Sequence, residues 1–185
     1  MATPRIVART DNRRAPNQIN RDTSPILAIG VPWASILLAS MASLSPVIAS
    51  APIMPPLGFM LLITWRMMRP GLLPVWAGLP LGAFDDLYSG QPMGSAVVLW
   101  SLAMLAMEFV DERYLWRGFF QDWLAAAGLF AGYLLLGAVI AGIASGYILP
   151  FAVLPQLVLT IALYPAVSGL VALLDRFRLT RFRTL

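Results

Sequence analysis

The chain contains no lysine, no histidine and no cysteine, and all 13 of its cationic side chains are arginines. The absence of histidine removes the commonest general base and metal ligand. The absence of cysteine and lysine removes thiol nucleophiles, disulfides and Schiff-base lysines.

Charge of either sign is also scarce. Charged residues make up 12% of the chain and hydrophobic residues 59%, whereas soluble domains carry roughly 25% charged residues. So little polar side-chain surface cannot cover a globule in water, which indicates a lipid environment. The arginines are divided among short segments between apolar runs, so we expect them to orient the chain in a membrane and not to bind nucleic acid.

Six apolar runs cover residues 26–44, 47–65, 71–88, 92–110, 123–143 and 148–174. As helices, the uninterrupted cores of the second and third runs (53–65 and 71–84) would span only ~20 Å of the ~30 Å hydrocarbon core. A single re-entrant hairpin would place Arg66 and Arg69 at mid-bilayer, at ~2.5–3.5 kcal/mol each. We therefore predict an all-α integral membrane protein with six transmembrane helices.

Six spans place every arginine on one side of the membrane. The arginines lie in the N-terminal tail, at Arg66 and Arg69, at Arg113 and Arg117, and from Arg176 to Arg183. The positive-inside rule then predicts that both termini are cytoplasmic. We expect a disordered basic tail (1–24), a transmembrane domain (25–175) and a second basic tail (176–185). Both tails are expected to lie against anionic membrane lipids, at ~1 kcal/mol per arginine.

Two of the runs carry small residues at four-residue spacing. The fifth run contains Gly128 and Gly132, followed by Ala138 and Gly142, and the third run contains Gly78 and Gly82. Residues four apart share one helix face, and small residues there allow another helix to approach closely. Such a face serves either as a subunit interface or in packing within the chain, and we favour packing within the chain.

Two adjacent carboxylates, Asp85 and Asp86, end the third run. Neighbours on a helix point ~100° apart, so these two do not form a dyad sharing one proton. Other carboxylates are predicted on the opposite side of the membrane, and the serines have no partner base. Too few oxygen ligands are present to predict a metal site. We expect no catalytic residues, no metal and no cofactor, although a lipid-active enzyme stays as one alternative.

The segment after these carboxylates has the composition of a tight turn. Asp86 is expected to accept hydrogen bonds from the Ser89 hydroxyl or from backbone N–H groups, as in Asx turns. Gly90 can adopt a positive φ, and Pro92 can start the next helix. We predict a rigid hairpin between two helices that is anchored by Asp86.

The stretch from Asp86 to Gly94, DLYSGQPMG, resembles the D-L-x-S-G-x-P-L-G motif of the MreD family of bacterial rod shape-determining membrane proteins. Asp86, Ser89, Gly90, Pro92 and Gly94 match that motif, and Met93 stands where leucine is usual. A second, less specific resemblance lies at Leu154-Pro155-Gln156 and Leu163-Tyr164-Pro165.

The resemblance implies a non-enzymatic scaffold of the cell-elongation machinery, spanning the bacterial inner membrane several times and supporting rod shape and peptidoglycan synthesis. It implies binding to an MreC-like bitopic protein and, indirectly, to an MreB-like filament and a synthase pair of a SEDS glycosyltransferase and a penicillin-binding protein. It also implies a compact bundle similar to the substrate-binding component of energy-coupling vitamin transporters. A small transporter or vitamin-binding membrane subunit is therefore the alternative, since fold does not decide function.

Overall fold

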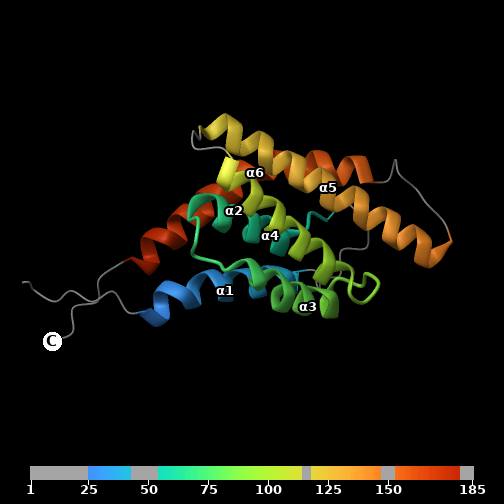
Figure 1. Ribbon diagram of the computed structural model, residues 1–185, viewed down its shortest axis with the longest axis horizontal. Helices are drawn as coiled ribbons and strands as arrows, with labels where there is room; N and C mark the ends of the chain where they lie inside the picture. The colour runs from blue at the N-terminus through green and yellow to red at the C-terminus, as the bar shows by residue number, and fades with distance from the viewer. Residues whose placement is uncertain (1–24, 43–53, 114–117, 147–152, 180–185) are drawn as a thin grey trace, which may run out of the picture.

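The computed structural model describes residues 25–42, 54–113, 118–146 and 153–179, and within these ranges all regular structure is helical (Figure 1). The six α-helices each lie within or overlap one of the six apolar runs, so the all-α fold predicted from the sequence is confirmed. They are α1 (Pro25–Met41), α2 (Leu57–Met68), α3 (Gly78–Tyr88), α4 (Ser95–Arg113), α5 (Phe119–Ser145) and α6 (Val153–Arg178), and one 3₁₀ turn, η2 (Val75–Ala77), precedes α3.

Proline residues determine where several of these helices begin. Helix α2 starts directly after Pro55 and Pro56, η2 follows Pro74, and Pro80 and Pro155 lie in the first turns of α3 and α6. Proline lacks an N–H group, which is tolerated in a first turn but disrupts a helix interior. Helix α2 therefore begins ten residues later than the apolar run that starts at residue 47, and it has 12 residues.

Helix α2 forms the centre of the bundle. Every residue from Gly58 to Met67 is buried, and the helix packs against α1, α4, α5 and α6. A helix that is apolar on all sides belongs in a core. Near its start, the ring of Phe59 stacks on that of Tyr133 from α5, with ring centroids 4.1 Å apart, and lies 5.9 Å from the ring of Trp100 from α4.

The small residues of α3 lie directly against the backbone of α4. A Cβ atom on Gly78 would lie 2.9 Å from the carbonyl oxygen of Trp100, and one on Gly82 would lie 2.7 Å from that of Ala96. Any larger residue would force the two backbones apart. These two glycines therefore serve packing within the chain, which was the favoured interpretation.

The small residues of α5 behave differently along the helix. A Cβ atom on Gly128 or Gly132 would meet nothing within 4 Å, whereas Gly142 is buried and Ala138 packs partly buried against the core. The first half of this small-residue face is therefore open, and packing within the described residues does not account for it.

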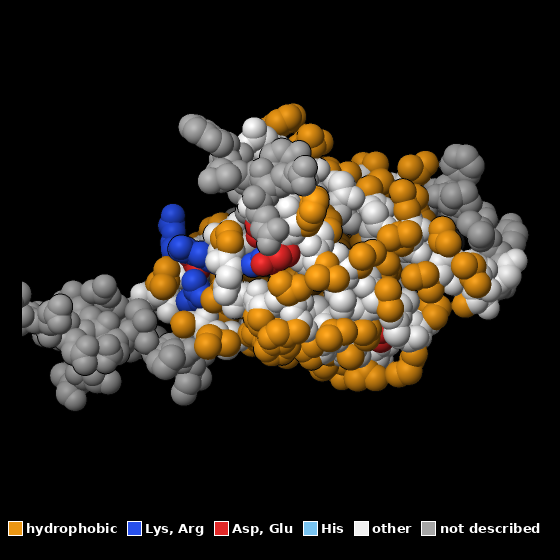
Figure 2. Space-filling view, in the orientation of Figure 1, with side chains coloured by type: hydrophobic (Ala, Val, Ile, Leu, Met, Phe, Trp, Pro, Cys, Tyr) orange, Lys and Arg blue, Asp and Glu red, His pale blue; other side chains and the backbone are white. Residues whose placement is uncertain are grey.

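Each of the six helices exposes large apolar side chains, among them Phe109 on α4 and Ile143 on α5, which is 76% exposed. Figure 2 shows apolar side chains spread over most of one face of the molecule. Contiguous apolar surface on this scale is rare on soluble monomers. Two helices, α5 and α6, are long and apolar enough to cross a membrane, and α1 and α2 are shorter apolar helices.

Candidate functional site

The Asp86 carboxylate ties the end of α3 to the start of α4. It accepts hydrogen bonds from the backbone N–H groups of Gly94 (3.0 Å), Ala96 (2.9 Å) and Val97 (3.2 Å), and from the Ser95 hydroxyl (3.3 Å). The first N–H groups of an α-helix have no partner within the helix, and a negative charge there is favoured by the helix dipole. Asp86 therefore caps α4 from a neighbouring helix.

The other residues of the turn motif lie partly as predicted. Gly90 has a φ of +66°, in the left-handed region that it was expected to supply. The Ser89 hydroxyl does not donate to Asp86: it is buried and has no hydrogen-bond partner among the described residues. Pro92 does not start the next helix either, because the φ of +91° at Gly94 is incompatible with a helix and α4 can begin only at Ser95.

The Asp85 side chain lies in the interior of the bundle. Its side chain is buried, and the group facing it from α1 is the Ser40 hydroxyl. The two adjacent carboxylates thus have separate surroundings, as expected from their angular separation on a helix.

Ion pairs fill the opposite end of the bundle. Arg66 of α2 is only 4% exposed and pairs with two carboxylates of α4, those of Glu108 and Asp111. Burial of an unpaired guanidinium would cost several kcal/mol, as it does for other ions that are removed from water. This pairing therefore holds α2 against α4.

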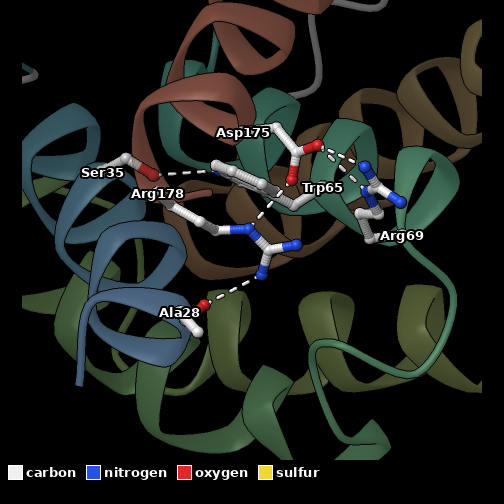
Figure 3. A network of polar contacts seen from close by, with 6 residues as sticks. All are labelled: Ala28, Ser35, Trp65, Arg69, Asp175 and Arg178. Carbon is white, nitrogen blue, oxygen red and sulfur yellow. Dashed lines mark hydrogen bonds and ion pairs between the residues drawn. The ribbon is translucent and has the colours of Figure 1, made fainter. Parts of the chain in front are cut away.

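Asp175 of α6 joins two further arginines at this end (Figure 3). Its carboxylate accepts from Arg69 Nη2 at 2.6 Å and from Arg178 Nε at 2.9 Å. Arg178 also donates to the backbone carbonyl of Ala28 in α1, at 2.9 Å, and its guanidinium lies 5.8 Å from the ring of Trp65 in α2. The hydrogen bond from Arg69 to Asp175, together with the charge of that carboxylate, raises the pKa of Arg69, so the pair stays charged.

The two polar ends are separated by a layer without charge. Along α1, Ala28 contacts the arginine end and Ser40 faces Asp85, and twelve helical residues correspond to ~18 Å. Residues 27–41, 57–65, 78–84, 95–107, 123–145 and 153–174 of the six helices contain no charged side chain. Figure 1 shows the start of α1 and the end of α6 at one end of the bundle and the α3–α4 turn at the other.

Sequence reasoning missed this ion-pair network. Glu108 and Asp111 were expected only to lie on the membrane side opposite Asp85 and Asp86, and their pairing with Arg66 was not predicted. Arg178 was assigned to the basic tail, whereas α6 extends to that residue and buries it. The available signal was that Asp175, Glu108 and Asp111 share a predicted membrane side with the arginines. The tail 1–24, Arg117, Arg181 and Arg183 lie outside the described residues, as does the side chain of Arg113.

Neither protein-family models, nor curated proteins, nor solved structures match the chain. Within the described ranges, no group of three potential metal-ligating side chains comes together. What the geometry offers is a capped turn at one end, an ion-pair network at the other, and an open small-residue face on α5.

Replacing Asp86 by alanine should destabilise the bundle more than the same change at Asp85. The Asp86 change leaves three backbone N–H groups without their acceptor, and loss of a helix cap costs ~0.5–2 kcal/mol. We expect a lower melting temperature and a smaller monodisperse fraction after detergent extraction. Equal tolerance of both changes would contradict the anchoring role of Asp86.

Arg178→Gln should lower the melting temperature in detergent strongly, while Arg176→Gln, two residues earlier on the exposed side of α6, should change it little. Breaking a buried ion pair by removing one partner costs ~3–5 kcal/mol, whereas exposed charges contribute ~1 kcal/mol or less. Similar melting temperatures for the two variants would show that the Arg178 contacts do not stabilise the fold.

Proposed function

We propose that the chain is a multi-pass protein of the bacterial inner membrane, with six membrane-spanning segments and both termini in the cytoplasm. The charge-free layer of the six helices and the apolar side chains exposed on each of them support this proposal. The described arginines gather at one end of the bundle, and arginine-rich ends face the cytoplasm. The short helices α2 and α3 would then be accommodated by local thinning of the bilayer or by tilting of their neighbours.

This orientation predicts the behaviour of topology reporters. A reporter that is active only in the periplasm should be active when fused after Gln91, in the turn capped by Asp86, and inactive when fused after Arg69. Fusion-protein levels measured by immunoblot serve as the control for expression. The reverse pattern of activity would refute the orientation.

We further propose that the protein is a non-enzymatic scaffold of the MreD type, supporting rod shape and organised peptidoglycan synthesis by holding an MreC-like bitopic partner. The observation that carries this proposal is the structural role of Asp86 within the family-like motif. Asp86 has both carboxylate oxygens engaged by the start of α4, so its role is architectural. A rigid turn of this kind suits a protein that presents helix faces to a partner.

The outer face of α5 is the surface that we assign to the partner's transmembrane helix. Gly128 lies in its middle, with open space beside it, and large exposed apolar residues continue the same face, namely Phe120, Leu124, Leu135, Val139 and Ile143. Helices in membranes associate by close packing over small residues and not by the hydrophobic effect. An MreB-like filament and a SEDS/penicillin-binding protein synthase would be bound indirectly, through the partner.

Gly128→Leu should weaken co-purification with an MreC-like protein after mild detergent extraction, because the leucine side chain would fill the close-approach surface of α5. Gly169→Leu on α6 is the matched control: Gly169 is also exposed, with nothing within 4 Å of a Cβ position. Both variants should keep the melting temperature of the unmodified chain. Absence of co-purification by the unmodified chain would refute the scaffold proposal, and equal losses in both variants would refute the α5 surface.

A small transporter or vitamin-binding membrane subunit is the second candidate function. The observation that favours it is a set of buried polar side chains at the end of the bundle where α3 turns into α4, beneath the Asp86 anchor. Saturable binding of a small molecule by the purified chain would support this candidate.

A further inference from the structure

Four polar or amphipathic side chains from four helices meet in the interior beneath the α3–α4 turn. This Asp85 cluster consists of Ser40 (α1), Asp85 (α3), Trp100 (α4) and Tyr133 (α5), which are 1%, 7%, 0% and 5% exposed. The carboxylates of Asp85 and Asp86 both act electrostatically on the Tyr133 hydroxyl. The cluster therefore lies in a region of negative potential inside an otherwise apolar bundle.

Two polar groups of the cluster are left without hydrogen-bond partners among the described residues, the Ser40 hydroxyl and the Trp100 indole N–H. The hydroxyl faces the Asp85 carboxylate and the indole faces the Tyr133 hydroxyl, but neither contact reaches hydrogen-bond geometry. A buried unsatisfied polar group costs ~1–3 kcal/mol. Such groups in a native protein indicate a water or ligand that completes the hydrogen bonding.

The charge of Asp85 is also uncompensated within the described residues. The chain has no lysine, and the carboxylates that pair with Arg66, Arg69 and Arg178 all lie at the opposite end of the bundle. Residues 43–53, which follow Ser40 in the chain, contain no arginine. Asp85 lies near the C-terminal end of α3, where the helix dipole further disfavours a negative charge. A buried carboxylate in this position is either neutralised by a proton or paired with a cation from outside the chain.

The surroundings of Asp85 select the kind of cation. Divalent metals need several oxygen ligands, and no group of three potential ligands occurs among the described residues. An ammonium group can donate hydrogen bonds to the single carboxylate and lie near the aromatic rings of Phe59, Trp100 and Tyr133. The indole N–H of Trp100 then requires an acceptor, which an oxygen atom of the same ligand would provide.

At Gly58, helix α2 packs closely against two side chains of the cluster. A Cβ atom on Gly58 would contact the Ser40 hydroxyl oxygen and would lie 3.2 Å from Cη2 of Trp100. Only glycine at this position leaves both side chains as they are. Gly58 therefore borders the same interior site from α2.

We propose that the Asp85 cluster is a binding site for a small primary amine that also carries an oxygen acceptor, as in an amino alcohol. The ammonium group pairs with Asp85, and the oxygen accepts from Trp100. The same chemistry occurs in free amines and in ethanolamine lipid headgroups. The site does not depend on the scaffold function, because it uses the interior of the bundle and not the outer face of α5.

The test uses the full chain, purified in detergent, with ethanolamine hydrochloride as the probe. Tryptophan fluorescence and melting temperature should both change saturably with ethanolamine, and neither sodium chloride nor neutral ethylene glycol should reproduce the change. Asp85→Asn, which keeps the shape of the side chain, should weaken the response at least tenfold. Asp122→Asn at the start of α5 should leave it unchanged.

Two further experiments test the site: a competition in nanodiscs identifies the source of the ligand, and a Gly58 variant tests the position of the site. In phosphatidylcholine nanodiscs, added phosphatidylethanolamine should suppress the response to free ethanolamine if the headgroup occupies the site, and should leave it intact if the ligand is a free amine. Gly58→Ala should weaken binding in a folded protein. A response equal to that of sodium chloride, or unchanged in Asp85→Asn, would overturn the proposal and leave water as the partner of the unsatisfied groups.

Discussion

The capping of α4 by Asp86 is the interaction on which the arrangement of the helices at this end depends. A carboxylate in the last turn of α3 is unfavourable for that helix, and the free N–H groups at the start of α4 compensate it. One helical turn earlier, Gly82 brings the backbones of α3 and α4 into contact. With the direction of Asp86 fixed toward α4, the ~100° step between helical neighbours directs Asp85 into the bundle. The position of the interior polar cluster is thus a consequence of the cap.

The opposite end is organised by a second constraint, the cost of burying charge. Arg66 and Arg178 are buried, and each has a carboxylate on the same or a neighbouring helix. Because removing charge from water costs several kcal/mol per ion, these pairs are weak sources of net stability but strict determinants of which helices can be neighbours. The Arg66 pairs join α2 to α4, the Arg69–Asp175 pair joins the residue after α2 to α6, and the Arg178–Ala28 hydrogen bond joins α6 to α1. The central position of α2 follows from these connections as well as from its apolar surface.

The sequence was sufficient to predict an all-helical fold and the approximate location of the helices in the described ranges, because apolar runs of this length have few other structures available to them. It was also sufficient to single out Asp86, since an acidic residue before a glycine- and proline-containing turn has a local mechanism. The start of α2 expected from the apolar run was wrong, because Pro55 and Pro56 override the apolar pattern. The expected start of α4 at Pro92 was also wrong, because Gly94 sets the boundary of that helix. The partners of Arg66 and Arg178 could not be predicted, since pairing across 42 and 150 residues depends on the tertiary arrangement.

Two features occur twice in the sequence, and in each case one copy is used in folding while the other is left without a partner among the described residues. Of the two adjacent carboxylates, Asp86 is saturated by hydrogen bonds from α4, whereas Asp85 faces groups that lack partners. Of the two small-residue pairs, Gly78 and Gly82 are pressed against the backbone of α4, whereas Gly128 and Gly132 face open space. A residue whose interactions are complete explains the fold and leaves little capacity for binding. The incomplete member of each pair is therefore where a ligand or partner gains most, and the two lie on different parts of the bundle, so that binding at one need not exclude binding at the other.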